Sequence, residues 1–186
     1  RISNRKILSG FLEALDLAEI SKDIFDVIDH AEKVTIEQTK SALEALNISA
    51  DKIAKILDFI KINGERETAI AALRDLEIKN AQFEAGVAEI DFVLKTLEQH
   101  GLAGVAIADM LIIRGLDYYT GTVFETILPE YKGIGSICSG GRYENLASNY
   151  TDQSFPGVGI SIGLTRLFYI LESNQMLGEF QSTSVD

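Results

Sequence analysis

Apolar residues in the first hundred positions recur at steps of three and four, which is the spacing of amphipathic helices. The longest set marks one side of a helix that follows Asn80, and it consists of Phe83, Val87, Ile90, Leu94 and Leu97. Shorter sets predict helices near residues 7–15, 24–28, 43–46, 53–60 and 70–76. We therefore expect residues 5–100 to be almost entirely helical and residues 1–4 to end a strand.

Local signals mark the ends of several of these helices. Thr35 and Gln38 have the form of a capping box, in which each side chain satisfies a free backbone donor of the other residue. Ser49 is expected to cap the next helix, and Asn63 with Gly64 to end it in a left-handed turn. The long helix is expected to close at residues 100–101.

The pattern changes after Gly101, where glycine becomes frequent and short apolar runs are typical of strands. We expect strands at residues 110–113, 122–128, 134–138 and 157–162, with helices starting at Tyr143 and Leu164. The connections are too short for helical crossovers, so the sheet is predicted to be mainly antiparallel. The fold class is therefore α+β, and residues 173–186 read as a linker or tail.

Composition excludes several classes of protein. Seventeen basic and 28 acidic residues give a formal net charge of −11, which argues against broad electrostatic binding to a phosphate backbone. Cys138 is the single cysteine and there are two histidines, so neither an intramolecular disulfide nor a zinc site is expected. His30 and His100 are expected at the surface or in helix caps. No membrane span or signal peptide is evident, so we expect a soluble, cytoplasmic protein.

Residues 114–125, with the sequence RGLDYYTGTVFE, combine an arginine, an aspartate and two adjacent tyrosines between two predicted strands. Polar and aromatic groups that flanking strands hold in position suit a small-molecule pocket. The alternative is an ordinary hairpin with a polar turn, and this stretch alone does not separate the two.

A second pattern lies at residues 155–167, where glycine occupies positions 157, 159 and 163. On a strand, Val158, Ile160 and Ile162 would pack into the core from one face, and the other face would be nearly bare backbone, on which a planar ring can lie. Arg166 follows in the first turn of a helix, where it could engage a phosphate. The spacing matches neither a P-loop nor a dinucleotide fingerprint. Close packing of two sheet layers is the alternative explanation.

A third, weaker signal is the sequence SGGRY at residues 139–143, where consecutive glycines permit close approach of a ligand before Arg142 and Tyr143 begin a helix. Tight turns often contain such glycine pairs. Cys138, which precedes it, is expected to be a small buried filler because no base partner is evident.

The three motifs together, in this order, resemble the histidyl-tRNA synthetase family of class II aminoacyl-tRNA synthetases. The first and second resemble its two histidine-recognition signatures, and the third resembles motif 3 of class II enzymes. The resemblance implies a catalytic-core segment at 1–16, a helical insertion domain at 17–103, and the C-terminal part of the catalytic core at 104–172. It also implies a fragment of a longer chain, because the first residue is not methionine and other class II motifs should flank this sequence.

The resemblance implies a role for each candidate residue. Arg114 would be catalytic at the α-phosphate of ATP, with magnesium bridging the phosphates. Histidine would be bound by Tyr118, Tyr119, Gly140, Gly141 and Tyr143. ATP would be bound by Gly157, Gly159, Gly163 and Arg166. No metal site within the protein itself is expected.

The parent protein would then activate histidine with ATP and transfer it to tRNA(His), as a homodimer, while the fragment alone would lack activity. Thr165 and Glu144 depart from the glutamate and aspartate common in the family, and neither departure excludes activity. The alternative is a regulatory subunit or sensor that kept the fold and lost aminoacylation. A further alternative treats residues 17–103 as an interaction module that contacts tRNA. However, basic and acidic residues alternate at 51–80, so no basic face is evident.

Overall fold

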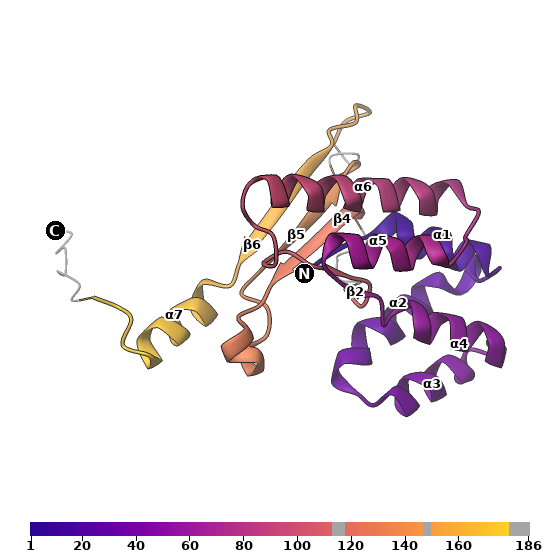
Figure 1. Cartoon of the computed structure of the whole chain (residues 1–186), viewed down its shortest axis with the longest axis horizontal. Helices are drawn as coiled ribbons and strands as arrows, with labels where there is room; N and C mark the ends of the chain where they lie inside the picture. Colours follow the sequence, from indigo (N-terminus) through magenta and orange to yellow (C-terminus); the bar gives the residue numbers. More distant parts are fainter. Residues whose placement is uncertain (113–117, 147–149, 179–186) are drawn as a thin grey trace.

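A computed structural model describes residues 1–112, 118–146 and 150–178 (Figure 1). The prediction of an α+β fold is confirmed, because a mostly antiparallel sheet is combined with helices. The helices of the first half gather on one side of the chain, and the strands lead away from them toward helix α7 (Figure 1).

The predicted helical half is confirmed. Its α-helices are α1 (Arg5–Ala14), α2 (Ser21–His30), α3 (Ile36–Ala45), α4 (Ala50–Phe59), α5 (Arg66–Asp75) and α6 (Ala81–Gln99). Two short 3-10 turns, η1 (Ala18–Ile20) and η2 (Ala31–Lys33), flank α2.

Capping signals identify the start of α3 and both ends of α6. Thr35 and Gln38 form the expected capping box at the start of α3. Asn80 starts α6, where its side-chain oxygen accepts hydrogen bonds from two backbone N–H groups. His100 is the C-cap of α6, and Gly101 follows with a φ of 78°.

One predicted helix end is wrong. Helix α4 ends at Phe59, before the expected stop at Asn63 and Gly64. These two residues instead form the short strand β2 (Asn63–Gly64), which pairs with β3 (Ala108–Asp109). The partner strand lies more than forty residues later in the chain, beyond the reach of a local signal.

The sheet has six strands in the order β2-β3-β1-β4-β5-β6. Strand β1 (Ile2–Asn4) lies in its middle, parallel to β3 and antiparallel to β4 (Tyr119–Thr126). Strands β5 (Cys138–Tyr143) and β6 (Gly157–Ile162) continue the sheet with antiparallel pairing, as predicted.

Several boundaries in the second half differ from prediction. Residues 142 and 143 end β5 rather than starting a helix, because their backbone pairs with β6. The run expected as a strand from residue 134 begins inside the 3-10 segment η3 (Pro129–Ile134), and β5 starts only at Cys138. Residues 110–112 follow β3 without forming a strand, and residue 113 lies outside the described residues. Helix α7 (Leu164–Ser173) begins where it was expected.

The hydrophobic core lies between the helices and the β1 side of the sheet. It joins residues of all six helices α1–α6 with Ile2, Ala108 and Met110. Helix α6, which the predicted domain boundaries assign to the insertion, packs on α1 and on strands β1 and β4. The buried residues of this core end at Met110, so β5, β6 and α7 contribute none. No helix within the described ranges is long and apolar enough to cross a membrane.

Candidate functional site

Strands β4, β5 and β6 have two different faces, because successive side chains on a strand point to opposite sides. The register sets Tyr119 beside Tyr143 and Tyr143 beside Gly157. We call this side of the sheet the tyrosine face. The opposite side, which helix α6 covers near β4, is called the α6 face. It carries Phe124, Gly140, Arg142, Val158, Ile160 and Ile162.

The three tyrosines predicted to bind histidine come together on the tyrosine face. Tyr118 lies edge-on to Tyr119, with ring centroids 4.6 Å apart, and edge-on to Tyr143 at 6.4 Å. Tyr119 belongs to strand β4 rather than to a loop, and the register between β4 and β5 shifts directly after it. Such a bulge changes the direction of a side chain, and bulges are frequent next to binding sites.

The surroundings of Tyr119 change its acidity. Burial, followed by hydrogen bonding and charge at Tyr118 and the charge at Tyr143, raises the pKa of Tyr119 to about 12. Each of these causes disfavours the phenolate. A phenolic hydroxyl is already neutral near pH 7, and the raised pKa extends the neutral form of Tyr119 to higher pH. In that form the hydroxyl can both donate and accept a hydrogen bond.

Two of the glycines of β6 lie beneath the Tyr143 ring. A Cβ atom at Gly157 would lie 2.6 Å from the Tyr143 hydroxyl oxygen and 2.7 Å from the ring carbon that bears it. A Cβ atom at Gly159 would make only an ordinary van der Waals contact, 3.6 Å from the Tyr143 ring. Gly157 is thus required by the tyrosine itself, whereas Gly159 has room for another group above it.

The glycine pair of β5 divides between the two faces. A Cβ at Gly141 would approach the Tyr119 ring at 2.9 Å, so Gly141 lies on the tyrosine face. A Cβ at Gly140 would lie 2.6 Å from the Phe124 ring and 2.1 Å from the carbonyl oxygen of Gly159. Close packing within the sheet therefore explains Gly140, while Gly141 borders the tyrosine cluster.

Arg166 lies in the first turn of α7, next to Gly163. Its Nη1 atom donates a hydrogen bond to the carbonyl oxygen of Ser136 at 2.6 Å. A guanidinium has five N–H donors, so this single bond leaves donors for an anion. Arg114, the predicted catalytic residue, lies outside the described residues.

Sequence reasoning missed an ionic cluster centred on Arg1. The guanidinium of Arg1 bonds Asp109 of β3 at 2.7 Å and Glu125 of β4 at 2.8 Å, and it also pairs with Glu32 of η2. Burial opposes the charge of Arg1, but Glu32 and Asp109 outweigh it and raise the arginine pKa. The one available signal was Glu125, a carboxylate within an apolar strand, because such a group needs a cationic partner.

One prediction for β6 is wrong. Val158, Ile160 and Ile162 alternate with the small residues as expected, but they do not pack into the core. Their exposed fractions are 64%, 66% and 61%. The strand lies at the edge of the sheet, and α6 covers only the part of the α6 face near β1 and β4.

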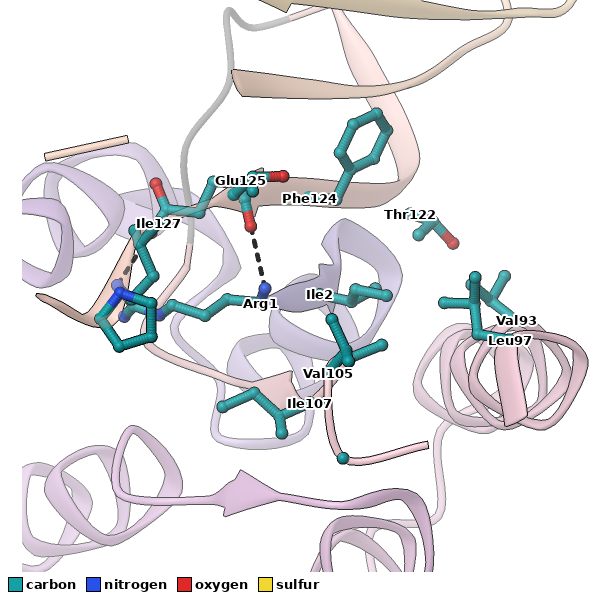
Figure 2. A pocket seen from close by; sticks show the side chains of 14 residues that line it. Arg1, Ile2, Val93, Leu97, Val105, Ile107, Thr122, Phe124, Glu125 and Ile127 are labelled. Atoms are coloured by element: carbon teal, nitrogen blue, oxygen red, sulfur yellow. Dashed lines mark hydrogen bonds and ion pairs between the residues drawn. The ribbon is translucent and has the colours of Figure 1, made fainter. Parts of the chain in front are cut away.

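A cavity of about 550 Å³ opens between α6 and the β1–β4 part of the sheet (Figure 2). Val93 and Leu97 of α6 lie on one side, and Ile2 and Phe124 on the other. None of the residues predicted to bind histidine or ATP lines it. The lining is mostly apolar, so this cavity is distinct in place and chemistry from the tyrosine face.

Comparison with known proteins adds to this geometry. A family model described as histidyl-tRNA synthetase matches residues 1–167. The chain belongs to the histidyl-tRNA synthetase family. It is 46% identical to the histidine-tRNA ligase of Clostridium tetani, an alignment that covers all of this chain and 42% of that protein. The corresponding ligase of Clostridium acetobutylicum is also 46% identical, over 98% of this chain and 42% of its own length.

Solved structures agree with this assignment. The crystal structure of histidyl-tRNA synthetase from Nostoc sp. PCC 7120 matches 96% of this chain with a TM-score of 0.88 and 40% identity. A Bacillus halodurans protein, titled an ATP phosphoribosyltransferase regulatory subunit/histidyl-tRNA synthetase, has a TM-score of 0.71 and 19% identity, which shows a shared fold alone. The chain spans about two fifths of the length of the ligases it matches.

Proposed function

We propose that this chain forms part of a histidine-tRNA ligase, in which the tyrosine face binds histidine. The parent would activate histidine with ATP to histidyl-adenylate and transfer it to tRNA(His), as a cytoplasmic homodimer. The observation that carries the proposal is the gathering of Tyr118, Tyr119 and Tyr143 around glycines of β5 and β6, in a chain of this family.

The tyrosine cluster suits a neutral imidazole ring. Such a ring presents one hydrogen-bond donor and one acceptor, and a phenolic hydroxyl can match either. The raised pKa of Tyr119 keeps its hydroxyl protonated well above physiological pH. An amino acid whose side chain cannot form these bonds leaves the hydroxyls unpaired, which gives strong discrimination against it.

The ATP side of the proposal uses the neighbouring strand. Gly159 and Gly163 would lie beneath the adenosine, since Gly159 has free space on the tyrosine face. Gly157 would contribute indirectly, through its contact with Tyr143. Arg166 would hold the terminal phosphate with the donors that Ser136 does not use.

Arg114 would stabilise negative charge on the α-phosphate as the histidine carboxylate attacks, a role suited to a fixed cation. Within the described ranges no group of three histidine, cysteine, aspartate or glutamate residues could hold a metal. In this proposal magnesium arrives with the phosphates of ATP, whose charge it neutralises.

The test compares Tyr119→Phe with wild type in the full-length protein that contains this chain. Loss of one buried hydrogen bond to the substrate should raise the KM for histidine about tenfold or more in ATP/pyrophosphate exchange, with little change in the KM for ATP. Tyr169→Phe is the matched control, because Tyr169 is 62% exposed on α7.

Two outcomes would contradict different parts of the proposal, the ligase activity and the role of Tyr119. Wild-type protein without histidine-dependent exchange would reject the ligase and favour the regulatory subunit or sensor. Active wild type with an unchanged KM for histidine in Tyr119→Phe would retain the ligase but remove Tyr119 from the histidine site.

A further inference from the structure

The guanidinium of Arg1 is held within the sheet by the pairing of its own backbone. The backbone nitrogen of Arg1 donates to the carbonyl oxygen of Glu125 at 2.9 Å, and the Glu125 N–H donates in return to the carbonyl oxygen of Arg1 at 3.0 Å. Arg1 thus continues the ladder of β1, which lies between β3 and β4. Such reciprocal pairing fixes the direction in which a side chain leaves a strand.

The Arg1 side chain leaves the sheet on the tyrosine face. Residues directly opposite one another on paired strands share a face, and so do residues two positions apart on one strand. A Cβ atom at Gly141 would lie 3.0 Å from the Val123 side chain and 2.9 Å from the Tyr119 ring, so Val123 is on the tyrosine face. Glu125 is two positions further along β4, and Arg1 is its partner. The ionic cluster therefore continues the surface that carries the tyrosines.

Each nitrogen of the Arg1 guanidinium binds a different element. Nε donates to Asp109 of β3 at 2.7 Å, and Nη1 donates to Glu125 of β4 at 2.8 Å. Nη2 pairs with Glu32 of η2. The side chains of Asp109 and Glu125 are 12% and 4% exposed, whereas that of Glu32 is 42% exposed. Arg1 is therefore the cation shared by two buried carboxylates, one on each strand beside β1.

The two buried carboxylates lie on either side of the tyrosines in the sequence. The second oxygen of Asp109 accepts a hydrogen bond from the Leu111 N–H at 3.0 Å, so Asp109 also fixes the turn that follows β3. Glu125 belongs to the strand that begins at Tyr119. Tyr118 and Tyr119 stand between these two anchors along the chain. One guanidinium consequently holds both β3 and β4, the strands before and after the start of the tyrosine cluster.

We propose that Arg1 is a positioning residue for histidine binding, which acts through β3 and β4 on the tyrosine cluster and does not itself touch the ligand. The inference rests on the proposed function of the tyrosine face. A guanidinium suits this task because its planar, fixed fork holds several acceptors in one geometry. The ammonium group of a lysine carries the same charge without that geometry.

An ion pair that only stabilises the fold is the competing explanation, and the KM for histidine separates the two. Loss of stability lowers the amount of folded enzyme and therefore the maximal rate, but it leaves the KM of the folded molecules unchanged. Displaced tyrosines raise the KM for histidine in every folded molecule, because small shifts of positioning groups weaken binding.

The experiment compares Arg1→Lys and Arg1→Met with wild type in the full-length protein that contains this chain. In ATP/pyrophosphate exchange, Arg1→Lys should raise the KM for histidine about threefold to fivefold and Arg1→Met about tenfold or more, with the KM for ATP changed less than about twofold. Arg1→Met leaves two buried carboxylates without their cation and can unfold the protein. Arg1→Lys retains a cation, so it decides the outcome in that case.

Two control variants are matched to these changes. Arg74→Lys makes the same substitution on α5, where the arginine side chain is 69% exposed. Glu32→Gln removes only the surface arm of the Arg1 cluster. Both should leave the KM for histidine within about twofold of wild type, because exposed ion pairs contribute little. A folded Arg1→Lys protein with the same KM for histidine as Arg74→Lys would overturn the proposal.

Hydrogen exchange of backbone amides tests the same fork without catalysis. In Arg1→Lys the amides of residues 119–126 should exchange about fivefold faster than in wild type, with the amides of α4 as the unchanged reference. Equal exchange at β4 would show that Arg1 does not hold this strand, and the inference would be wrong. Faster exchange at β4 in a protein whose wild type lacks histidine-dependent activity would reject the proposed function, and with it the link to histidine, while the holding of β4 by Arg1 would stand.

Discussion

The helices α1–α6 bury their apolar sides against one another, whereas β6 and α7 leave much of theirs exposed. Phe11 and Phe59 stack in the first region with ring centroids 4.4 Å apart, and both are essentially inaccessible. In the second region Ile160 and Phe168 have exposed fractions of 66% and 47%. The two regions contain similar apolar residues, but only the first encloses them.

This difference separates apolar residues that stabilise the chain by burial from apolar residues that remain on its surface. In the helical region the buried residues of the core cluster all lie between Ile2 and Met110. In the second region the tyrosine face gathers three aromatic side chains, and the α6 face leaves the apolar side chains of β6 exposed. Composition alone does not distinguish these cases, because Leu, Ile, Val and Phe occur in both.

The largest effect is expected from Phe59→Ala. It removes a fully buried ring that stacks on Phe11, so the free energy of unfolding should fall by about 3–5 kcal/mol. The same change at Phe168 should cost less than about 1 kcal/mol, because the ring is already half exposed. Urea denaturation of the two variants measures the contrast, and equal losses would remove the distinction between the two regions.

A smaller effect should separate two glycines of the same strand. Gly157→Ala forces a methyl group against the Tyr143 ring and should lower stability by about 1–3 kcal/mol. Gly159→Ala meets only an ordinary contact and should change stability by less than about 0.5 kcal/mol. The chain has no tryptophan, so tyrosine emission can report disturbance of the cluster. A Gly159 variant as unstable as the Gly157 variant would show that strand geometry, and not the ring, requires glycine.

The smallest effect concerns Glu89, which joins α6 to α1 and β1. Burial opposes its ionisation, but hydrogen bonds from Lys6 and Asn4 and the charges of Lys6 and Arg142 outweigh burial, so the pKa of Glu89 is lowered. A lowered folded pKa gives stability that is present above the unfolded value, about 4.3, and is lost as pH falls through the folded value.

Urea midpoints measured from neutral to acid pH should therefore fall less steeply in Glu89→Gln than in wild type. Glu84→Gln, at an exposed position on the same helix, is the control. An identical pH dependence in wild type and Glu89→Gln would show that the ionised carboxylate does not stabilise the contacts of α6 with α1 and β1.

Interactions between residues close in sequence make the helical half predictable from sequence. The capping box at Thr35 and Gln38 and the cap at Asn80 involve residues within three positions of one another, so the pattern contains the whole interaction. The stop expected at Asn63 failed because its backbone pairs with β3, far along the chain. The helix expected from Tyr143 failed for the same reason, since the backbone there pairs with β6.

The sequence by itself determined the helical periods, the alternation on β6 and the three motifs that relate the chain to its family. Only the tertiary structure decided which faces are covered. It also set Tyr119 against Tyr143, brought Arg1 to Asp109 across 108 positions, and left Ile160 exposed. The physical reason is that spacing along the chain fixes the direction of a side chain relative to its own strand or helix. What lies in that direction depends on pairing between distant segments.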